Sequence, residues 1–63
     1  METVKFYIFA YADNTYRIES TNKRYNLFRD KVRPERVILA MEDIADKMRN
    51  MYDCDVVFEF SYI

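Results

Sequence analysis

The sequence predicts an α+β fold of the type β-β-α-β, with a three-stranded antiparallel sheet in the order 2-1-3 and one long amphipathic helix packed on one face. Three observations predict it. Two segments rich in β-branched and aromatic residues flank a turn signal, an apolar period of 3.6 residues follows Pro34, and a third β-rich segment closes the chain. A chain of 63 residues makes one domain, residues 1–63.

The first two strands form a predicted hairpin. Thr3–Ala12 (TVKFYIFAYA) is strand 1 and Thr15–Ser20 (TYRIES) is strand 2, because both are rich in residues that favour pleated backbone. Asp13 and Asn14 between them tolerate left-handed turn geometry. Since the chain has no glycine, any turn with positive φ is expected to use Asn or Asp.

The next segment, Thr21–Arg33, is predicted to be irregular. Its first three residues resemble a turn, and the stretch Arg24–Arg29 either extends strand 2 or forms a short third strand. Three large side chains are expected to hold the segment against the body of the domain. They are Tyr25, Leu27 and Phe28.

A helix of about five turns at 3.6 residues per turn follows. Pro34 suits its first position, and Glu35 complements the positive end of its dipole. The apolar stripe consists of Val37, Met41, Ile44, Met48 and Met51, widened by Ile38, Ala45 and Tyr52. Asp53-Cys54-Asp55 ends the helix, and Val56–Ile63 is the last strand. One face of this strand carries Val56, Phe58, Phe60 and Tyr62, and the other carries Val57, Glu59, Ser61 and Ile63.

Strand 1 is apolar on both faces, although a single helix covers only one of them. The even positions from Val4 onward are expected to face the helix. Tyr7, Phe9 and Tyr11 then lie on the open face and form a candidate partner-binding surface. In the alternative interpretation, Tyr25–Phe28 folds back over this face and closes it.

The hairpin register has two possible forms, which give the open face different neighbours. A two-residue loop places Tyr16 and Ile18 beside the aromatic row, whereas a three-residue loop places Arg17 and Glu19 there.

Basic residues outnumber acidic ones between positions 23 and 36. The basic residues are Lys23, Arg24, Arg29, Lys31, Arg33 and Arg36, and the acidic ones are Asp30 and Glu35. Because Tyr25 and Phe28 lie among these cations, the stretch offers the pairing of charge and stacking that single-stranded nucleic acid sites use. The candidate contacts are Arg24, Tyr25, Phe28 and Arg29. A net charge of −1 favours the alternative, a solvated segment whose cations meet acids on the helix.

The usual catalytic and metal-binding residues are missing. There is no His for general base work or metal binding, and a single Cys permits neither an internal disulfide nor a closed zinc site. Without glycine there is no phosphate-cradling loop. Cys54 is expected to be a small buried hydrophobe, with an intermolecular disulfide as the alternative. We therefore expect no catalytic, cofactor-binding or metal-binding residues, no small-molecule substrate and no enzymatic activity.

The sequence thus predicts a small protein–protein interaction module that binds a protein partner, forms a homodimer through its sheet, or does both. Residues with AT-rich codons dominate the composition, which suggests a low-GC bacterium or one of its phages, and hence an inhibitor of a host enzyme or defence complex. The alternative function is binding of single-stranded nucleic acid through residues 23–36. The chain has no signal peptide pattern and no membrane-spanning run, and its one cysteine is unpaired. These features predict a cytoplasmic location, in the bacterial host if the chain is phage-encoded.

Overall fold

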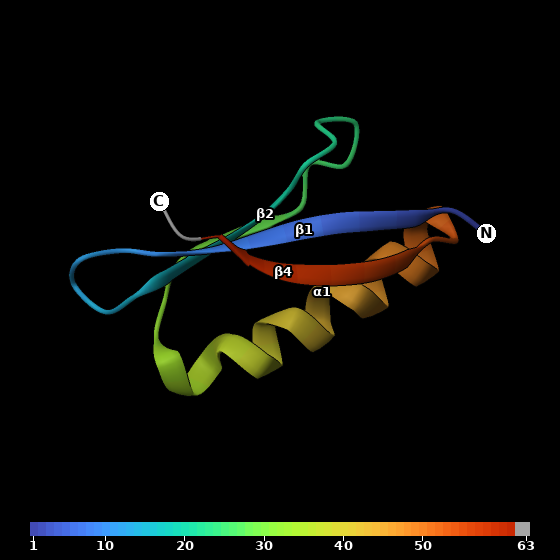
Figure 1. Ribbon diagram of the computed structural model, residues 1–63. Helices are drawn as coiled ribbons and strands as arrows, with labels where there is room; N and C mark the ends of the chain where they lie inside the picture. The colour runs from blue at the N-terminus through green and yellow to red at the C-terminus, as the bar shows by residue number, and fades with distance from the viewer. Residues whose placement is uncertain (62–63) are drawn as a thin grey trace.

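The sheet has four strands, one more than the sequence predicted. The computed structural model describes residues 1–61 and shows the α+β class and the long helix on one face that were expected (Figure 1). Tyr62 and Ile63, at the predicted end of the last strand, lie outside the described residues. The elements are β1 (Thr3–Ala10), β2 (Tyr16–Ser20), β3 (Phe28–Val32), a 3-10 turn (Pro34–Arg36), α1 (Val37–Tyr52) and β4 (Asp55–Ser61).

The additional strand, β3, lies within the segment predicted to be irregular. It pairs antiparallel with β2, with Phe28 opposite Glu19 and Arg29 opposite Ile18. The full order is β3-β2-β1-β4. Because β3 reverses the chain once more before the helix, β4 runs parallel to β1 from the Thr3–Asp55 pair onward. The prediction of an all-antiparallel sheet was therefore wrong, while the placement of the last strand beside β1 was confirmed.

The β1–β2 hairpin has a three-residue loop. The Tyr11 N–H donates to the Thr15 carbonyl oxygen over 2.8 Å, and Asn14 takes the left-handed conformation with φ 67°. The Asp13 carboxylate accepts from both the amide and the hydroxyl of Thr15. Both strands are therefore shorter than predicted, ending at Ala10 and beginning at Tyr16. Arg17 lies opposite Phe9, as the three-residue alternative requires.

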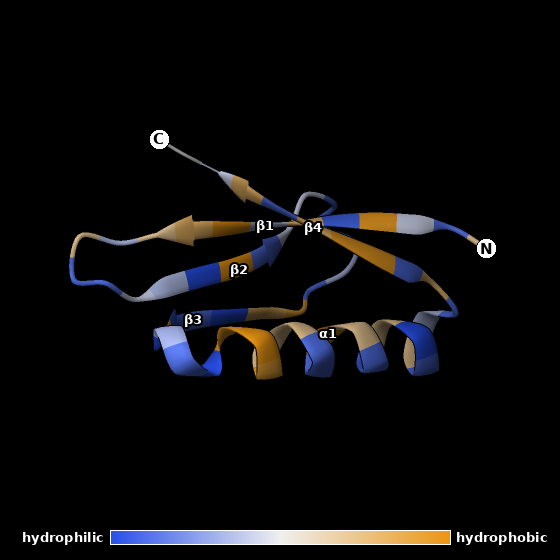
Figure 2. Ribbon diagram, turned by 60° about the horizontal axis from the view of Figure 1, so that its bottom comes forward, coloured by the Kyte–Doolittle hydropathy of each residue, from blue (hydrophilic) through white to orange (hydrophobic). Residues whose placement is uncertain are grey.

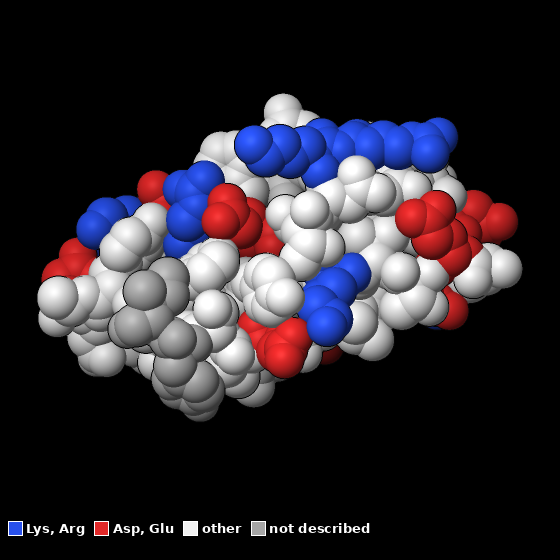
Figure 3. Space-filling view, turned by 45° about the horizontal axis from the view of Figure 1, so that its top comes forward, with Lys and Arg blue, Asp and Glu red and all other residues white. Residues whose placement is uncertain are grey.

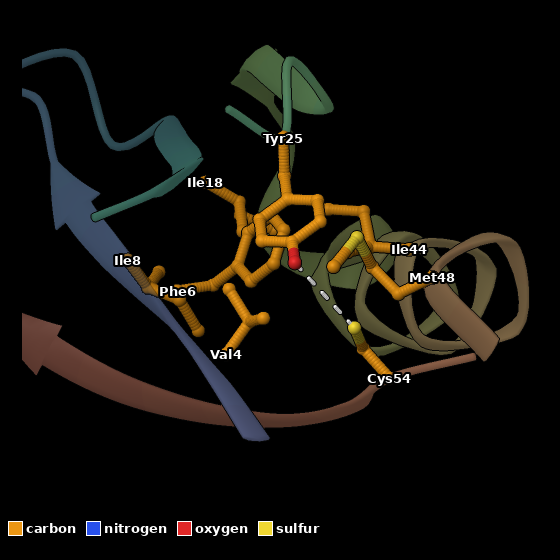
Figure 4. Packing of buried hydrophobic residues seen from close by; sticks show 8 residues of the cluster. All are labelled: Val4, Phe6, Ile8, Ile18, Tyr25, Ile44, Met48 and Cys54. Carbon is orange, nitrogen blue, oxygen red and sulfur yellow. Dashed lines mark hydrogen bonds between the residues drawn. The ribbon is translucent and has the colours of Figure 1, made fainter. Parts of the chain in front are cut away.

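The core lies between α1 and the central strands. From the sheet, Val4, Phe6, Ile8 and Ile18 are buried, and from the helix Ile44 and Met48 (Figure 4). The centre of the predicted helical stripe is therefore confirmed. Met51, the last residue of the predicted stripe, is exposed, as are Ile38 and Tyr52 among the residues expected to widen it, while Ala45 is half-buried.

Tyr25 and Cys54 close the core near the C-terminal end of α1 (Figure 4). The Tyr25 hydroxyl donates to the Glu2 carboxylate over 3.1 Å and lies 3.7 Å from the Cys54 sulfur. The Tyr52 ring meets the Tyr25 ring edge-on at 4.9 Å. The hydrogen bond with Cys54, together with burial and the bond to Glu2, raises the pKa of Tyr25 to about 12. The expectation that Cys54 is buried is confirmed.

Replacing Ile44 by Ala tests this core. Ile44 is fully buried between helix and sheet, so we expect a loss of about 2–5 kcal/mol in the free energy of unfolding, comparable to the total stability of so small a domain. Leu39→Ala is the matched control, because Leu39 is 58% exposed on the outer side of the same helix and should change stability by less than about 0.5 kcal/mol. Urea unfolding measures both variants, and equal losses would contradict the assigned core.

Candidate protein interface

The open face of the sheet carries an aromatic row bordered by charged side chains. Tyr7 and Phe9 are half-buried, with ring centroids 6.0 Å apart, and their β2 partners in the ladder are Glu19 and Arg17. Phe28 joins this face from β3, because it lies opposite Glu19. The row of Tyr7, Phe9 and Tyr11 is thus on the predicted face.

Arg17 is the centre of the charged network on this face. Its guanidinium pairs with Glu19 at 3.1 Å and with Asp30 at 3.4 Å, and it lies 4.9 Å from the centroid of the Phe28 ring. The Tyr11 hydroxyl donates to the other Asp30 oxygen over 2.6 Å. These contacts tie β1, β2 and β3 together over the aromatic rings.

Two lysines extend this arrangement. Lys5 pairs with Glu59 of β4 at 3.2 Å and lies 6.0 Å from the Tyr7 ring, and Lys31 lies 4.2 Å from the Tyr11 ring. Figure 3 shows Lys and Arg side chains and Asp and Glu side chains scattered among uncharged surface on this side, with a run of basic side chains along its upper edge. The open face is therefore a mixed polar and aromatic surface.

The residues of the basic stretch point in several directions. Tyr25 is buried in the core, and Leu27 packs against the same core cluster. These two side chains therefore do not close the open face of the sheet. Phe28 lies on the open face, while Arg29 reaches the helix and pairs with Asp43. The four candidate nucleic-acid contacts, Arg24, Tyr25, Phe28 and Arg29, thus do not share one surface.

The two edge strands of the sheet, β3 and β4, differ in how well they are protected from pairing with another strand. At the β3 edge, the register shifts between Tyr16 and Ile18, and Lys31 has φ 54°. Lys31 is an exception to the expectation that positive φ falls on Asn or Asp; Asn14 and Asp53 fulfil it. The charged side chains of β3 are held by Asp43, Tyr11, Arg17 and Asp13. Irregular backbone and charge of this kind prevent another strand from pairing at an edge.

The β4 edge lacks these protections along Asp55–Ser61. Within this strand there is no Pro and no positive φ, and Glu59, already paired with Lys5, is its only charged residue after Asp55. Figure 2 shows the contrast, with β4 largely hydrophobic and β3 largely hydrophilic. Asp55 donates its N–H inward to Glu2. Because ladder bonds alternate along a strand, the outward N–H and C=O groups belong to Val56, Phe58 and Phe60.

Apolar side chains border this edge on both sides. Phe60 lies opposite Ile8 and faces the helix layer, yet it is 53% exposed. Val57 on the open face is 46% exposed. Where β4 begins, Arg49 near the C-terminal end of α1 pairs with Asp55 at 2.7 Å.

Sequence reasoning did not assign this edge to a site. A signal was present in the low charge of VVFEF. That signal does not say which strand lies at the edge of the sheet, and only an edge strand offers its backbone groups to a partner.

One hollow of about 410 Å³ lies where the Ser20–Phe28 segment borders the sheet. Its charged lining residues are Arg17, Glu19 and Lys23, of which the first two already form an ion pair. Among residues 1–61, no three His, Cys, Asp or Glu side chains are grouped so that they could hold a metal ion. Over the same residues, no helix combines the length and apolar character needed to cross a membrane.

Comparison with known proteins identifies no matching family model, no matching curated protein and no matching solved structure.

Three exposed aspartates, Asp13, Asp30 and Asp43, have pKa values below the ordinary Asp value of 3.8. The Tyr11 hydroxyl lowers the pKa of Asp30, the Thr15 hydroxyl lowers that of Asp13, and Lys47 with Arg29 lowers that of Asp43. A lowered folded-state pKa gives stability that is complete above the unfolded-state pKa of about 3.9 and is lost as pH falls through the folded-state values. We therefore expect the urea midpoint to fall as pH drops below about 4.

Tyr11→Phe isolates one cause of this acid sensitivity. It removes the hydroxyl that contributes most to the lowered Asp30 pKa, so the Asp30 carboxyl should titrate closer to its ordinary value in an NMR pH titration. Asp43 is the internal control, because its partners are Lys47 and Arg29. An Asp30 titration identical in wild type and variant would contradict the assigned hydrogen bond.

Proposed function

We propose that this chain is a small protein–protein interaction module that binds an extended protein segment along the free edge of β4. The observation that carries the proposal is the difference between the two sheet edges. The β3 edge is irregular, charged and tied to the helix, whereas the β4 edge is regular and bordered by exposed apolar side chains.

Strand addition matches what this edge offers. The outward backbone groups of Val56, Phe58 and Phe60 form a row of donors and acceptors that a partner strand can satisfy. Seven residues at roughly 3.3 Å each span about 23 Å, enough for a short partner strand to pair throughout its length. Main-chain hydrogen bonds of this kind contribute affinity, while side chains on the two faces contribute selectivity.

The side chains favour an apolar partner on both faces. Val57 and Phe60 lie on opposite sides of the edge, and both lose water when a neighbouring strand is added. The aromatic row of Tyr7, Phe9 and Tyr11 lies one strand further in. A partner that also extends over the open face would contact this row. The Lys5–Glu59 ion pair joins β1 to β4 on that face and gives such a partner polar groups to contact.

The remaining expectations about the partner stay predictions. Inhibition of a host enzyme or defence complex rests on composition alone. Nucleic-acid binding through residues 23–36 requires Arg24, Phe28 and Arg29 to act together, although Phe28 and Arg29 lie on opposite faces of β3.

Photo-crosslinking tests the proposed site in the intact protein. A photoreactive phenylalanine analogue at position 60 should give covalent protein adducts in the cells that produce the chain, because Phe60 borders the proposed contact. The matched control carries the same analogue at Leu39, which is comparably exposed on the outer side of α1. Mass spectrometry identifies the adducts. Absence of an adduct at position 60, or equal yields at the two positions, would exclude β4 as the binding edge.

A further inference from the structure

We infer that the strand which pairs with β4 is β4 of a second copy of this chain, antiparallel about a two-fold axis, with Phe58 opposite Phe58 of the partner subunit. This inference rests on the proposed function, since it identifies the occupant of the same edge. It follows from the backbone alternation of β4, the positions of its two acids and the side chains beside them.

Backbone alternation limits the possible registers. For two copies of β4 to bond, residues with outward groups must lie opposite one another, and these residues are Val56, Phe58 and Phe60. A symmetric antiparallel pair with substantial overlap must therefore be centred on Val57, Phe58 or Glu59. Centres nearer either end of Asp55–Ser61 leave too little of the strand paired.

Repulsion between like charges disfavours two of these three registers. A centre at Glu59 places that carboxylate directly opposite Glu59 of the partner subunit, and a centre at Val57 places Asp55 opposite Glu59 of the partner subunit. Like charges directly opposite one another destabilise a strand pair. A centre at Phe58 avoids both contacts, because Glu59 then faces Val57 of the partner subunit and Asp55 faces Ser61 of the partner subunit.

The Phe58 register also makes neighbouring side chains complementary. Within one subunit, Val57 of β4 lies opposite Lys5 of β1. In the dimer, Glu59 of the partner subunit lies on the other side of Val57. Opposite charges thus border an exposed apolar side chain on the open face. On the helix side, Phe60 lies opposite Val56 of the partner subunit, so its exposed ring is covered by another apolar residue.

The resulting dimer is a continuous eight-stranded sheet. Because directly opposite residues point to the same face, the two-fold axis is perpendicular to the sheet, and both helices lie on one side. The free β4 edges cover each other, and the blunted β3 edges become the ends of the sheet. A chain of 63 residues has a small core, and association is a common source of further stability at this size.

Light scattering after size-exclusion chromatography tests the inferred dimer. At tens of micromolar, the wild-type chain should have a mass of twice 7.7 kDa. Val56→Pro removes an outward N–H without removing a β1–β4 bond, and Phe60→Lys places a charge at the edge, so both should give 7.7 kDa. Leu39→Lys introduces the same charge on the outer face of α1 and should remain dimeric. A monomeric wild type, or a Leu39→Lys monomer beside dimeric edge variants, would overturn the inference.

Cysteine pairing tests the register. In a Cys54→Ala background, Val57→Cys and Glu59→Cys chains should form a disulfide when mixed, because these positions face each other across the two-fold axis at a non-hydrogen-bonded pair, about 4.5 Å between Cα atoms. Each variant alone should form little dimer. Disulfides from Val57→Cys alone or Glu59→Cys alone would instead establish a register centred on that residue and overturn the Phe58 register.

Crosslinking at position 60 and the mass of the wild-type chain together distinguish a free binding edge from a self-paired one. If position 60 crosslinks to an unrelated protein while the wild-type chain is monomeric, the edge binds a partner and the self-pairing is wrong. If position 60 gives no adduct at all and the chain is monomeric, both the proposed function and the inferred dimer are wrong.

Discussion

The constraint on which this structure depends is that an open sheet of four strands has two edges and two faces, while residues 1–61 supply one long helix to cover it. The helix covers one face over Phe6, Ile8 and Ile18. The remaining face and the two edges must be made compatible with water by other means. The open face, the β3 edge and the β4 edge differ in how well charged side chains and irregular backbone protect them. The least protected of them, the β4 edge, is the one we assign to a partner.

On the open face, ion pairs take the place of a second layer. The Arg17 side chain lies over the Phe28 ring, and its guanidinium pairs with the carboxylates of Glu19 and Asp30. The side chain thus covers an apolar surface while its charge is paired. Exposed ion pairs of this kind contribute little stability individually. Here their lysines lie beside two half-buried rings, those of Tyr7 and Tyr11. At the β3 edge, the positive φ of Lys31 and the Arg29–Asp43 bridge interrupt further pairing. The β4 edge has no comparable protection along Asp55–Ser61, which is why we place the partner there.

The elements defined by local pattern were predictable from the sequence. The periodicity after Pro34 predicted α1, the β-rich N-terminal segment predicted β1, and the junction at Cys54 was expected to be buried. β3 was not predictable in this way, because Phe28–Val32 is mostly charged and is held by β2, the helix and Arg17. Missing one strand also reversed the expected direction of β4. The β4 edge was missed because the edge status of a strand depends on its neighbours and not on its own residues.

Hydrogen exchange of the backbone amides, measured at several protein concentrations, tests most directly whether β4 is a pairing edge. The outward amides of Val56, Phe58 and Phe60 should become more protected as concentration rises, since pairing of β4 with a second copy satisfies them. The amides of β3 should show no such dependence, because that edge is blunted. Outward β4 amides that exchange as fast as freely exposed amides at every concentration would contradict self-pairing through this edge.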